Sequence, residues 1–327
     1  MMEWKYLIAL SLILFGCLGQ NTATGQASNL TPDSNLSAPP ANQPFGPGDH
    51  FETLEFGGYN RTFIVYVPRS YDGSRPYPLV VVLHGAGGRA ESIERTSGFN
   101  RLADDEGFIA VYPQALGDHN ASKTFEPEEV VAWGAGEGCC GFAGENGVDD
   151  IAFIGAMLDY VEGRLSIDKQ RVYAAGLSNG GMMSYALGCR MSDRFAAIAP
   201  VAGWMEIDCK PAQPMSVVAI HGTADRSVPY EGGTGPVVTL IVPSVRSEID
   251  FWSVFNGCDY AENATVAKDV TAERHYGCRN GTGVLLYKIE GGGHVWPGPG
   301  APGPESREIN AAVEIWKFFR SHPKSMQ

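Results

Sequence analysis

The chain has 327 residues, of which 44% are hydrophobic, and it carries a formal net charge of −13. This length allows one large α/β domain or two smaller ones, and the hydrophobic fraction is sufficient for a sizeable core. The negative charge argues against nucleic acid as a partner and against a basic membrane-binding surface.

The N-terminal segment has the pattern of an export signal. Lys5 precedes an apolar run over residues 6–16 that is too short for an ordinary transmembrane helix. The residues Leu14-Phe15-Gly16-Cys17 resemble a lipobox, in which Cys17 is lipidated and becomes the mature N-terminus. The alternative is an ordinary signal peptide that is cleaved elsewhere. We therefore expect residues 1–17 to direct export to the cell surface, with the membrane contacted only through the lipid anchor.

Composition divides the rest of the chain into a tether and one domain. Residues 18–47 contain almost no large apolar side chain and predict a flexible polar tether. We expect a single catalytic domain over residues 48–322 and a short tail over residues 323–327. Two long irregular segments, 118–147 and 230–245, are predicted to be functional loops, because such loops are uncommon inside a compact domain.

Strand-like and helix-like segments alternate along the domain. Strand patterns cover residues 61–67, 79–83, 108–112, 172–175, 196–201, 217–220 and 284–289. Apolar residues at helical spacing predict helices over 149–164, 182–187 and 308–320. This alternation predicts an α/β fold whose mostly parallel sheet is flanked by helices.

The cysteine count agrees with an oxidising compartment. If Cys17 carries lipid, six of the seven cysteines remain, and an even number suits disulfides. We favour the pair Cys258–Cys278 at the ends of one irregular segment, and the pair Cys189–Cys209 after residue 178. Two neighbouring cysteines then remain, either as a vicinal bridge or with other partners: Cys139 and Cys140. The cysteine spacing gives no support to a zinc site, and we expect no metal.

The most informative motif is Gly176-Leu177-Ser178-Asn179-Gly180, which lies between a predicted strand and a predicted helix. This context is typical of a nucleophile elbow. Ser178 would then occupy a strained turn, and the two glycines would remove Cβ atoms that clash there. The alternative is a surface turn rich in small residues.

A serine nucleophile needs a base, and the base needs a carboxylate that orients it. Asp225 is the best acid candidate, because it follows the strand over residues 217–220, and the chemistry of an α/β sheet lies at the carboxyl ends of its strands. His294 is the best base candidate, because it follows the last strand and three glycines. His84 and His221 precede glycines at strand ends and are predicted to position loops.

The oxyanion of an acyl-transfer reaction needs backbone N–H donors. We expect one donor to be the amide of Asn179, directly after the nucleophile. The other should come from the glycine-rich loop after the strand over residues 79–83, with Ala86 favoured and Gly85 as the alternative.

Several motifs in order resemble the polyhydroxybutyrate depolymerase/feruloyl esterase family. The resemblance covers about residues 49–322 and rests on Leu83-His84-Gly85, Cys139-Cys140-Gly141 with Val148-Asp149-Asp150, the motif around Ser178, His221-Gly222-Thr223-Ala224-Asp225 and Gly291-Gly292-Gly293-His294-Val295-Trp296-Pro297-Gly298. It implies an α/β-hydrolase fold related to family-1 carbohydrate esterases. It also implies a secreted serine esterase in which Ser178, Asp225 and His294 form the catalytic triad.

The resemblance leaves the substrate open among short-chain, hydroxyalkanoate and feruloyl or acetyl-polysaccharide esters. Trp133, Trp204 and Trp296 lie in or near loops that should border the site, where they either contact substrate or pack in the interior. No cofactor is expected. Two alternatives are a prolyl-oligopeptidase-like serine peptidase and a surface binding protein that kept the scaffold without activity.

Overall fold

The computed structural model describes residues 45–117, 130–136, 140–235 and 241–325. Cys17, the signal segment and almost all of the predicted tether lie outside these ranges. Over the ranges described, none of the helices combines the length and apolar character that crossing a bilayer requires.

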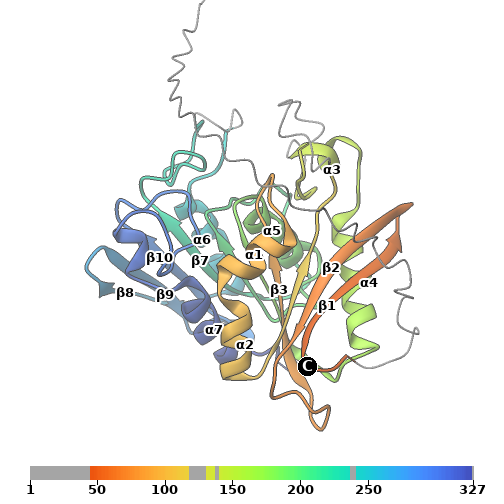
Figure 1. The fold of residues 1–327 in the computed structure, drawn as a ribbon. Coiled ribbons are helices and arrows are strands. Elements are labelled where there is room, and N and C mark those ends of the chain that lie inside the picture. Colours follow the sequence, from red (N-terminus) through yellow and green to blue (C-terminus); the bar gives the residue numbers. More distant parts are fainter. Residues whose placement is uncertain (1–44, 118–129, 137–139, 236–240, 326–327) are drawn as a thin grey trace, which may run out of the picture. The chain divides into compact units, whose positions relative to one another are not determined.

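A mixed sheet, ten-stranded over the described residues, forms the centre of the domain (Figure 1). Its strands are β1 (Gly48–Phe56), β2 (Tyr59–Val67), β3 (Tyr77–Leu83), β4 (Ile109–Pro113), β5 (Ile167–Leu177), β6 (Ala197–Val201), β7 (Ser216–Gly222), β8 (Tyr260–Ala267), β9 (Val270–Tyr276) and β10 (Val284–Ile289). Their order in space is β1-β2-β4-β3-β5-β6-β7-β10-β9-β8. The strands from β4 to β10 in this order run parallel, and the outer strands on both sides are antiparallel.

Burial along the strands explains this arrangement. The strands β3, β4, β6 and β7 are buried over their whole length, as expected for parallel strands that are covered on both faces. By contrast, β1 alternates between half-buried and exposed residues, which suits an edge strand with one face towards water. The apolar runs therefore occupy the middle of the sheet, where the carboxyl ends of the parallel strands carry the candidate site.

Helices cover both faces of the sheet. They are α1 (Ala90–Ser97), α2 (Phe99–Glu106), α3 (Gly141–Glu145), α4 (Asp150–Glu162), α5 (Asn179–Arg190), α6 (Val245–Asn256) and α7 (Ala311–Ser321), with short 3₁₀ turns at Arg279–Gly281 and Glu305–Arg307. The buried residues of α1, α2 and α7 pack with Val80 and Val82, and those of α4, α5 and α6 pack with Val81 and Leu83. Because side chains alternate along β3, these are opposite faces. Figure 1 shows α1 and α2 in front of the strands, with α5 and α6 behind.

The predicted fold class is confirmed, and each predicted strand and helix has a counterpart at nearly the predicted place. Seven elements have no predicted counterpart: β1, β8, β9, α1, α2, α3 and α6. The segment between Cys258 and Cys278 was predicted to be irregular, and this was wrong, because β8 and β9 form an antiparallel hairpin there. The strand β8 is exposed over almost all its length, so it lacks the buried apolar residues that reveal a strand.

Both favoured disulfide pairs are formed, Cys189–Cys209 and Cys258–Cys278, each across a sequence separation of 20 residues. The first joins α5 to the loop after β6, and the second joins the end of α6 to the segment after β9. Cys140 is also disulfide-bonded, whereas Cys139 lies outside the described residues.

Candidate active site

Ser178 lies on a sharp turn between β5 and α5. Its φ of 58° and ψ of −121° are in a region that residues other than glycine rarely adopt, so the turn stores backbone strain. A Cβ at Gly176 would overlap the carbonyl group of Gly180, and a Cβ at Gly180 would overlap the carbonyl oxygen of Leu83. The two glycines of the motif therefore allow the close approach that the turn needs, as the sequence predicts.

His294 and Asp225 are hydrogen-bonded to each other. Nδ1 of His294 lies 2.8 Å from Oδ2 of Asp225, which follows β7, while His294 follows β10. The carboxylate can only accept, so Nδ1 is the protonated nitrogen, and in the neutral ring Nε2 is free to take a proton. Neither Nε2 of His294 nor the hydroxyl of Ser178 has a hydrogen-bond partner among the described residues. Both groups remain available to a substrate.

The surroundings of Asp225 keep its carboxylate ionised. Its side chain is completely buried, and Oδ1 accepts hydrogen bonds from the amides of Ser227 and Val228, both at 2.8 Å. Nε2 of His221 donates to the carbonyl of Val228 at 2.9 Å and lies 3.4 Å from Oδ2 of Asp225. Burial alone would raise the pKa of Asp225, but the hydrogen bonds from His221 and His294 outweigh it and hold that pKa well below its usual value.

Backbone hydrogen bonds join the loops that carry the acid and the base. The amide of Thr223 donates to the carbonyl of Ile289 at 2.9 Å, and the amide of Ala224 donates to that of Gly292 at 2.9 Å. The hydroxyl of Thr223 also accepts from the amide of Gly291 at 2.9 Å. The relative position of Asp225 and His294 is thus fixed by main chain on both sides.

Hydrogen bonds hold the loop after β3 on both sides of Ala86, which is exposed. Nε2 of His84 accepts from the amide of Ala115 at 3.1 Å, so Nδ1 carries the proton and donates to the carbonyl of Gly85 at 2.8 Å. The amide of Gly87 donates to Val131 at 2.7 Å. The amides of Ala86 and Asn179 have no partner among the described residues, which is the state that an oxyanion donor requires.

The side chain of Asn179 has a role that the sequence analysis missed. Its Oδ1 accepts from the amide of Trp133 at 2.7 Å, and its Nδ2 donates to the carbonyl of Trp133 at 3.1 Å. Nε1 of Trp133 donates to the carbonyl of His84 at 2.9 Å. These bonds tie the elbow, the segment 130–136 and the loop after β3 to one another. A buried asparagine inside a Gly-x-Ser-x-Gly motif gives no local signal of a distant partner.

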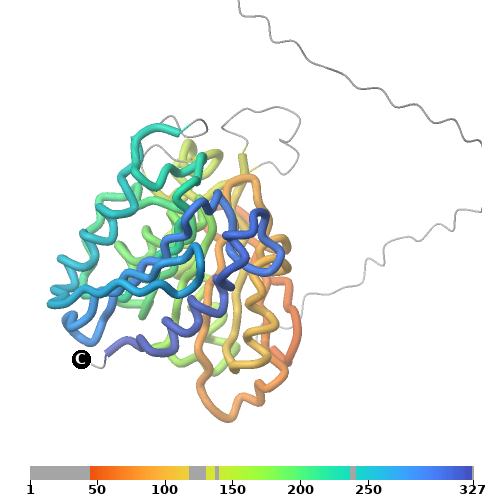
Figure 2. The backbone as a smooth tube through the Cα atoms, turned by 90° about the vertical axis from the view of Figure 1, so that its left-hand side faces the viewer, coloured from red at the N-terminus to blue at the C-terminus, as the bar shows by residue number. Residues whose placement is uncertain are grey.

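The three tryptophans occupy different environments. Trp133 is fully buried and Trp204 is 3% exposed, so both pack in the interior and neither presents a face to a substrate. The expectation that these two side chains bind substrate is therefore corrected. Trp296 is half-buried beside Phe99, and its Nε1 donates to the carbonyl of Ser97 at 3.2 Å. Figure 2 shows the segment after β10, which carries Trp296, beside the segment that carries α1.

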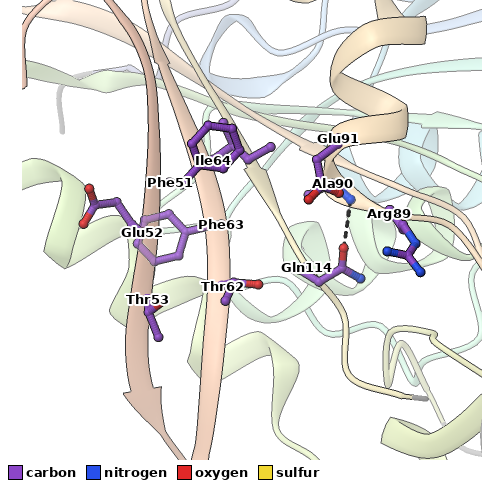
Figure 3. A pocket seen from close by; sticks show the side chains of 10 residues that line it. All are labelled: Phe51, Glu52, Thr53, Thr62, Phe63, Ile64, Arg89, Ala90, Glu91 and Gln114. Atoms are coloured by element: carbon purple, nitrogen blue, oxygen red, sulfur yellow. Dashed lines mark hydrogen bonds between the residues drawn. The ribbon is translucent and has the colours of Figure 1, made fainter. Parts of the chain in front are cut away.

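A hollow of about 240 Å³ lies between the β1–β2 hairpin and the start of α1 (Figure 3). Its lining includes Phe51, Thr62 and Gln114, and Oε1 of Gln114 accepts from the amide of Ala90 at 2.9 Å. None of Ser178, Asp225 and His294 lines it, so we do not assign the reacting groups of a substrate to this hollow. Gln114 also contacts His84, with 3.1 Å between their Nε2 atoms, so it supports the loop after β3 from this side.

A buried carboxyl group anchors the loop after β6. Glu248 on α6 is 2% exposed, and it accepts hydrogen bonds from the amide of Met205 and from the hydroxyl of Tyr185 at 3.2 Å. Burial raises the pKa of Glu248 to about 8, although both hydrogen bonds act in the opposite direction. Together with the bridge from Cys189 to Cys209, this group fixes the loop next to the elbow.

Comparison with known proteins assigns the chain to a protein family. Residues 61–231 match the family described as Esterase PHB depolymerase, which is more than half of the chain.

The chain belongs to this esterase family.

Two relatives of the family are named as feruloyl esterases. Feruloyl esterase C of Emericella nidulans is 29% identical over 269 residues, covering 79% of this chain and 83% of that protein. Feruloyl esterase B of Piromyces equi is 30% identical over 244 residues, covering 72% of this chain but only 42% of that protein. NocK of Nocardia uniformis subsp. tsuyamanensis is 29% identical over 267 residues, with 74% of each chain covered.

Solved structures of other proteins share the fold. The acetyl xylan esterase from Aspergillus awamori aligns with a TM-score of 0.57 at 15% identity, covering 83% of this chain and 99% of that one. The structure described as pOPH native gives a TM-score of 0.56 at 20% identity, covering 87% and 90%. The family assignment identifies the chain as a carboxylic ester hydrolase. The likeness to the solved structures shows that it has an α/β-hydrolase fold.

Proposed function

We propose that this esterase works through an acyl-enzyme on Ser178, with His294 as the base and Asp225 as the residue that orients it. The observation that carries the proposal is the 2.8 Å bond between Nδ1 of His294 and Oδ2 of Asp225. This bond leaves the lone pair of Nε2 free, at the same sheet edge as the strained serine.

The reaction follows from these groups. Oγ of Ser178 attacks the ester carbonyl while Nε2 of His294 takes the hydroxyl proton. The amides of Ala86 and Asn179 stabilise the oxyanion. The alcohol then leaves with the proton from Nε2, and a water molecule, activated by the same nitrogen, releases the acid. Asp225 keeps the ring in its tautomer and stabilises the imidazolium.

For the substrate we propose feruloyl or acetyl esters of polysaccharides. Feruloyl esters are supported by the names of the relatives from Emericella nidulans and Piromyces equi, whose alignments cover most of this chain. We further propose that the protein is exported and anchored through Cys17. Three of its described features, the bridges Cys189–Cys209 and Cys258–Cys278 and the bonded Cys140, suit an oxidising compartment.

The test compares wild type with Ser178→Ala on p-nitrophenyl acetate, methyl ferulate, acetylated xylan, hydroxybutyrate oligomers and a peptide substrate. We expect Ser178-dependent hydrolysis of the esters but not of the peptide, with methyl ferulate preferred over the hydroxybutyrate oligomers. Full turnover by a folded Ser178→Ala variant would overturn the mechanism. A preference for the hydroxybutyrate oligomers would contradict the proposed substrate class and indicate polyester substrates instead.

A further inference from the structure

An ion pair between Arg61 on β2 and Asp150 on α4 is completely buried. Nη2 of Arg61 lies 2.6 Å from Oδ1 of Asp150, and neither side chain has any exposed surface. The guanidinium also stacks over the ring of Phe153, 3.8 Å from its centroid. The same Nη2 lies 3.4 Å from the carbonyl oxygen of Gln114, at the end of β4.

Stability alone does not explain this pair. Nε and Nη1 of Arg61 are buried without a hydrogen-bond partner among the described residues. Burial lowers the pKa of Arg61 and raises the pKa of Asp150, in both cases against the attraction of the partner. Removal of both charges from water therefore outweighs their mutual attraction, and apolar residues of similar volume often replace such a pair without loss of stability.

The second oxygen of Asp150 leads from this pair to the active site. Oδ2 accepts a hydrogen bond from the amide of Gly134 at 2.8 Å. The preceding residue, Trp133, is bonded through its main chain to Asn179 and through Nε1 to the carbonyl of His84. The carbonyl of Val131, in the same segment, accepts from the amide of Gly87 at 2.7 Å. The segment 130–136 thus touches both places from which the two oxyanion donors come.

We propose that Asp150, held by Arg61, is a positioning residue that fixes the segment 130–136 and thereby sets the distance between the amides of Ala86 and Asn179. This inference rests on the proposed function, because it concerns the oxyanion donors of that reaction. Since the donors act on charge that develops in the transition state, their displacement lowers kcat and leaves KM nearly unchanged.

The test removes both charges at once, with the double variant Arg61→Met/Asp150→Leu. This avoids an unpaired buried charge and takes the acceptor away from the amide of Gly134. We expect kcat for p-nitrophenyl acetate to fall roughly 10- to 100-fold, less than the 100- to 1,000-fold loss of a whole oxyanion donor, with KM changed less than about twofold. Inhibition by phenylboronic acid, which places an oxygen in the oxyanion site, should weaken by the same factor as kcat/KM.

The matched control is Arg194→Met/Asp159→Leu. Asp159 lies on the same helix, α4, and Nη2 of Arg194 lies 2.8 Å from its Oδ1, but these side chains are 30% and 68% exposed. We expect kcat within about twofold of wild type for this variant. A test variant that folds and matches this control in kcat and in boronic acid affinity overturns the proposal, as does a loss confined to KM.

A second variant keeps the test decisive if the double variant does not fold. Trp133→Phe keeps an aromatic ring but removes the bond from Nε1 to the carbonyl of His84. We expect a roughly 3- to 10-fold loss of kcat with little change in KM, and unchanged kcat contradicts the proposal. The proposed function fails separately, if wild type itself shows no turnover that depends on Ser178.

Discussion

The carboxylate of Asp225 divides its two oxygens between main chain and His294. Oδ1 accepts hydrogen bonds from the amides of Ser227 and Val228. Oδ2 lies 2.8 Å from Nδ1 of His294 and, at the longer distance of 3.4 Å, beside Nε2 of His221. The two backbone amides therefore fix the orientation of the carboxylate independently of the imidazole. Any side chain that replaces Asp225 has to accept hydrogen bonds from the amides of Ser227 and Val228 on one side and contact the imidazole of His294 on the other.

Asp225→Asn tests this relationship. The amide oxygen has to face the two backbone donors, so the NH₂ group faces Nδ1 of His294 and favours the tautomer with the proton on Nε2. That nitrogen can no longer accept the proton of Ser178. We expect kcat for p-nitrophenyl acetate to fall roughly 1,000- to 10,000-fold with near-normal thermal stability. A loss below about tenfold would show that Asp225 does not orient the base.

Glu248 makes stability depend on pH. Its pKa is about 8 in the folded protein and ordinarily 4.5, so folding favours the protonated form. Below pH 4.5 both states are protonated and there is no penalty. Between about 4.5 and 8 the unfolded chain loses this proton first, so the free energy of unfolding falls as pH rises, by up to roughly 5 kcal/mol.

Glu248→Gln should remove this dependence. The amide can accept from Met205 through its oxygen and donate to the hydroxyl of Tyr185 through its nitrogen. Urea unfolding at pH 5 and pH 8.5 should show a variant close to wild type at the lower pH and more stable at the higher one. Equal pH dependence of the unfolding free energy in both proteins would show that Glu248 is not the group responsible.

The two described disulfides allow a matched comparison, since each spans 20 residues. The loop-closure argument gives each bridge about 3 kcal/mol. We expect Cys189→Ala/Cys209→Ala and Cys258→Ala/Cys278→Ala to lose similar stability in urea. Only the first should also lower kcat, because it frees the loop after β6 beside the elbow. Equal kcat in both variants would show that the loop after β6 does not affect turnover.

Cys17 decides how the protein is attached. We expect the full chain to partition into the membrane fraction of the expressing cell, and Cys17→Ala to abolish this while hydrolysis of p-nitrophenyl acetate stays the same. Cell fractionation with an activity assay measures both properties. Unchanged partitioning in the variant would show that the lipid is not the anchor.

Local patterns were sufficient for much of the fold and for the bond between Asp225 and His294. The buried strand β3 is a continuous apolar run, and the elbow carries its glycines at the positions where a Cβ would clash. Each of these features depends on residues that are close together in the sequence. The hairpin of β8 and β9 escaped prediction because β8 is exposed on both faces, and edge pairing leaves little trace in such a sequence.

Other parts of the site depend on contacts between residues far apart in the chain. The bond between Asn179 and Trp133 spans 46 positions, and that between Arg61 and Asp150 spans 89. Nothing in either local sequence indicates the partner. Trp133 was expected either to contact substrate or to pack in the interior, because it lies in the irregular segment 118–147. Its indole packs inside and donates to the carbonyl of His84.

The most direct measurement of the central claim is the site of covalent labelling by a fluorophosphonate, which reacts preferentially with an activated serine. Wild type treated with the probe and analysed by peptide mass spectrometry should carry one adduct, on Ser178, with activity lost in proportion to labelling. His294→Ala should label far more slowly. An adduct on another serine, or full inactivation with Ser178 unmodified, would contradict the account.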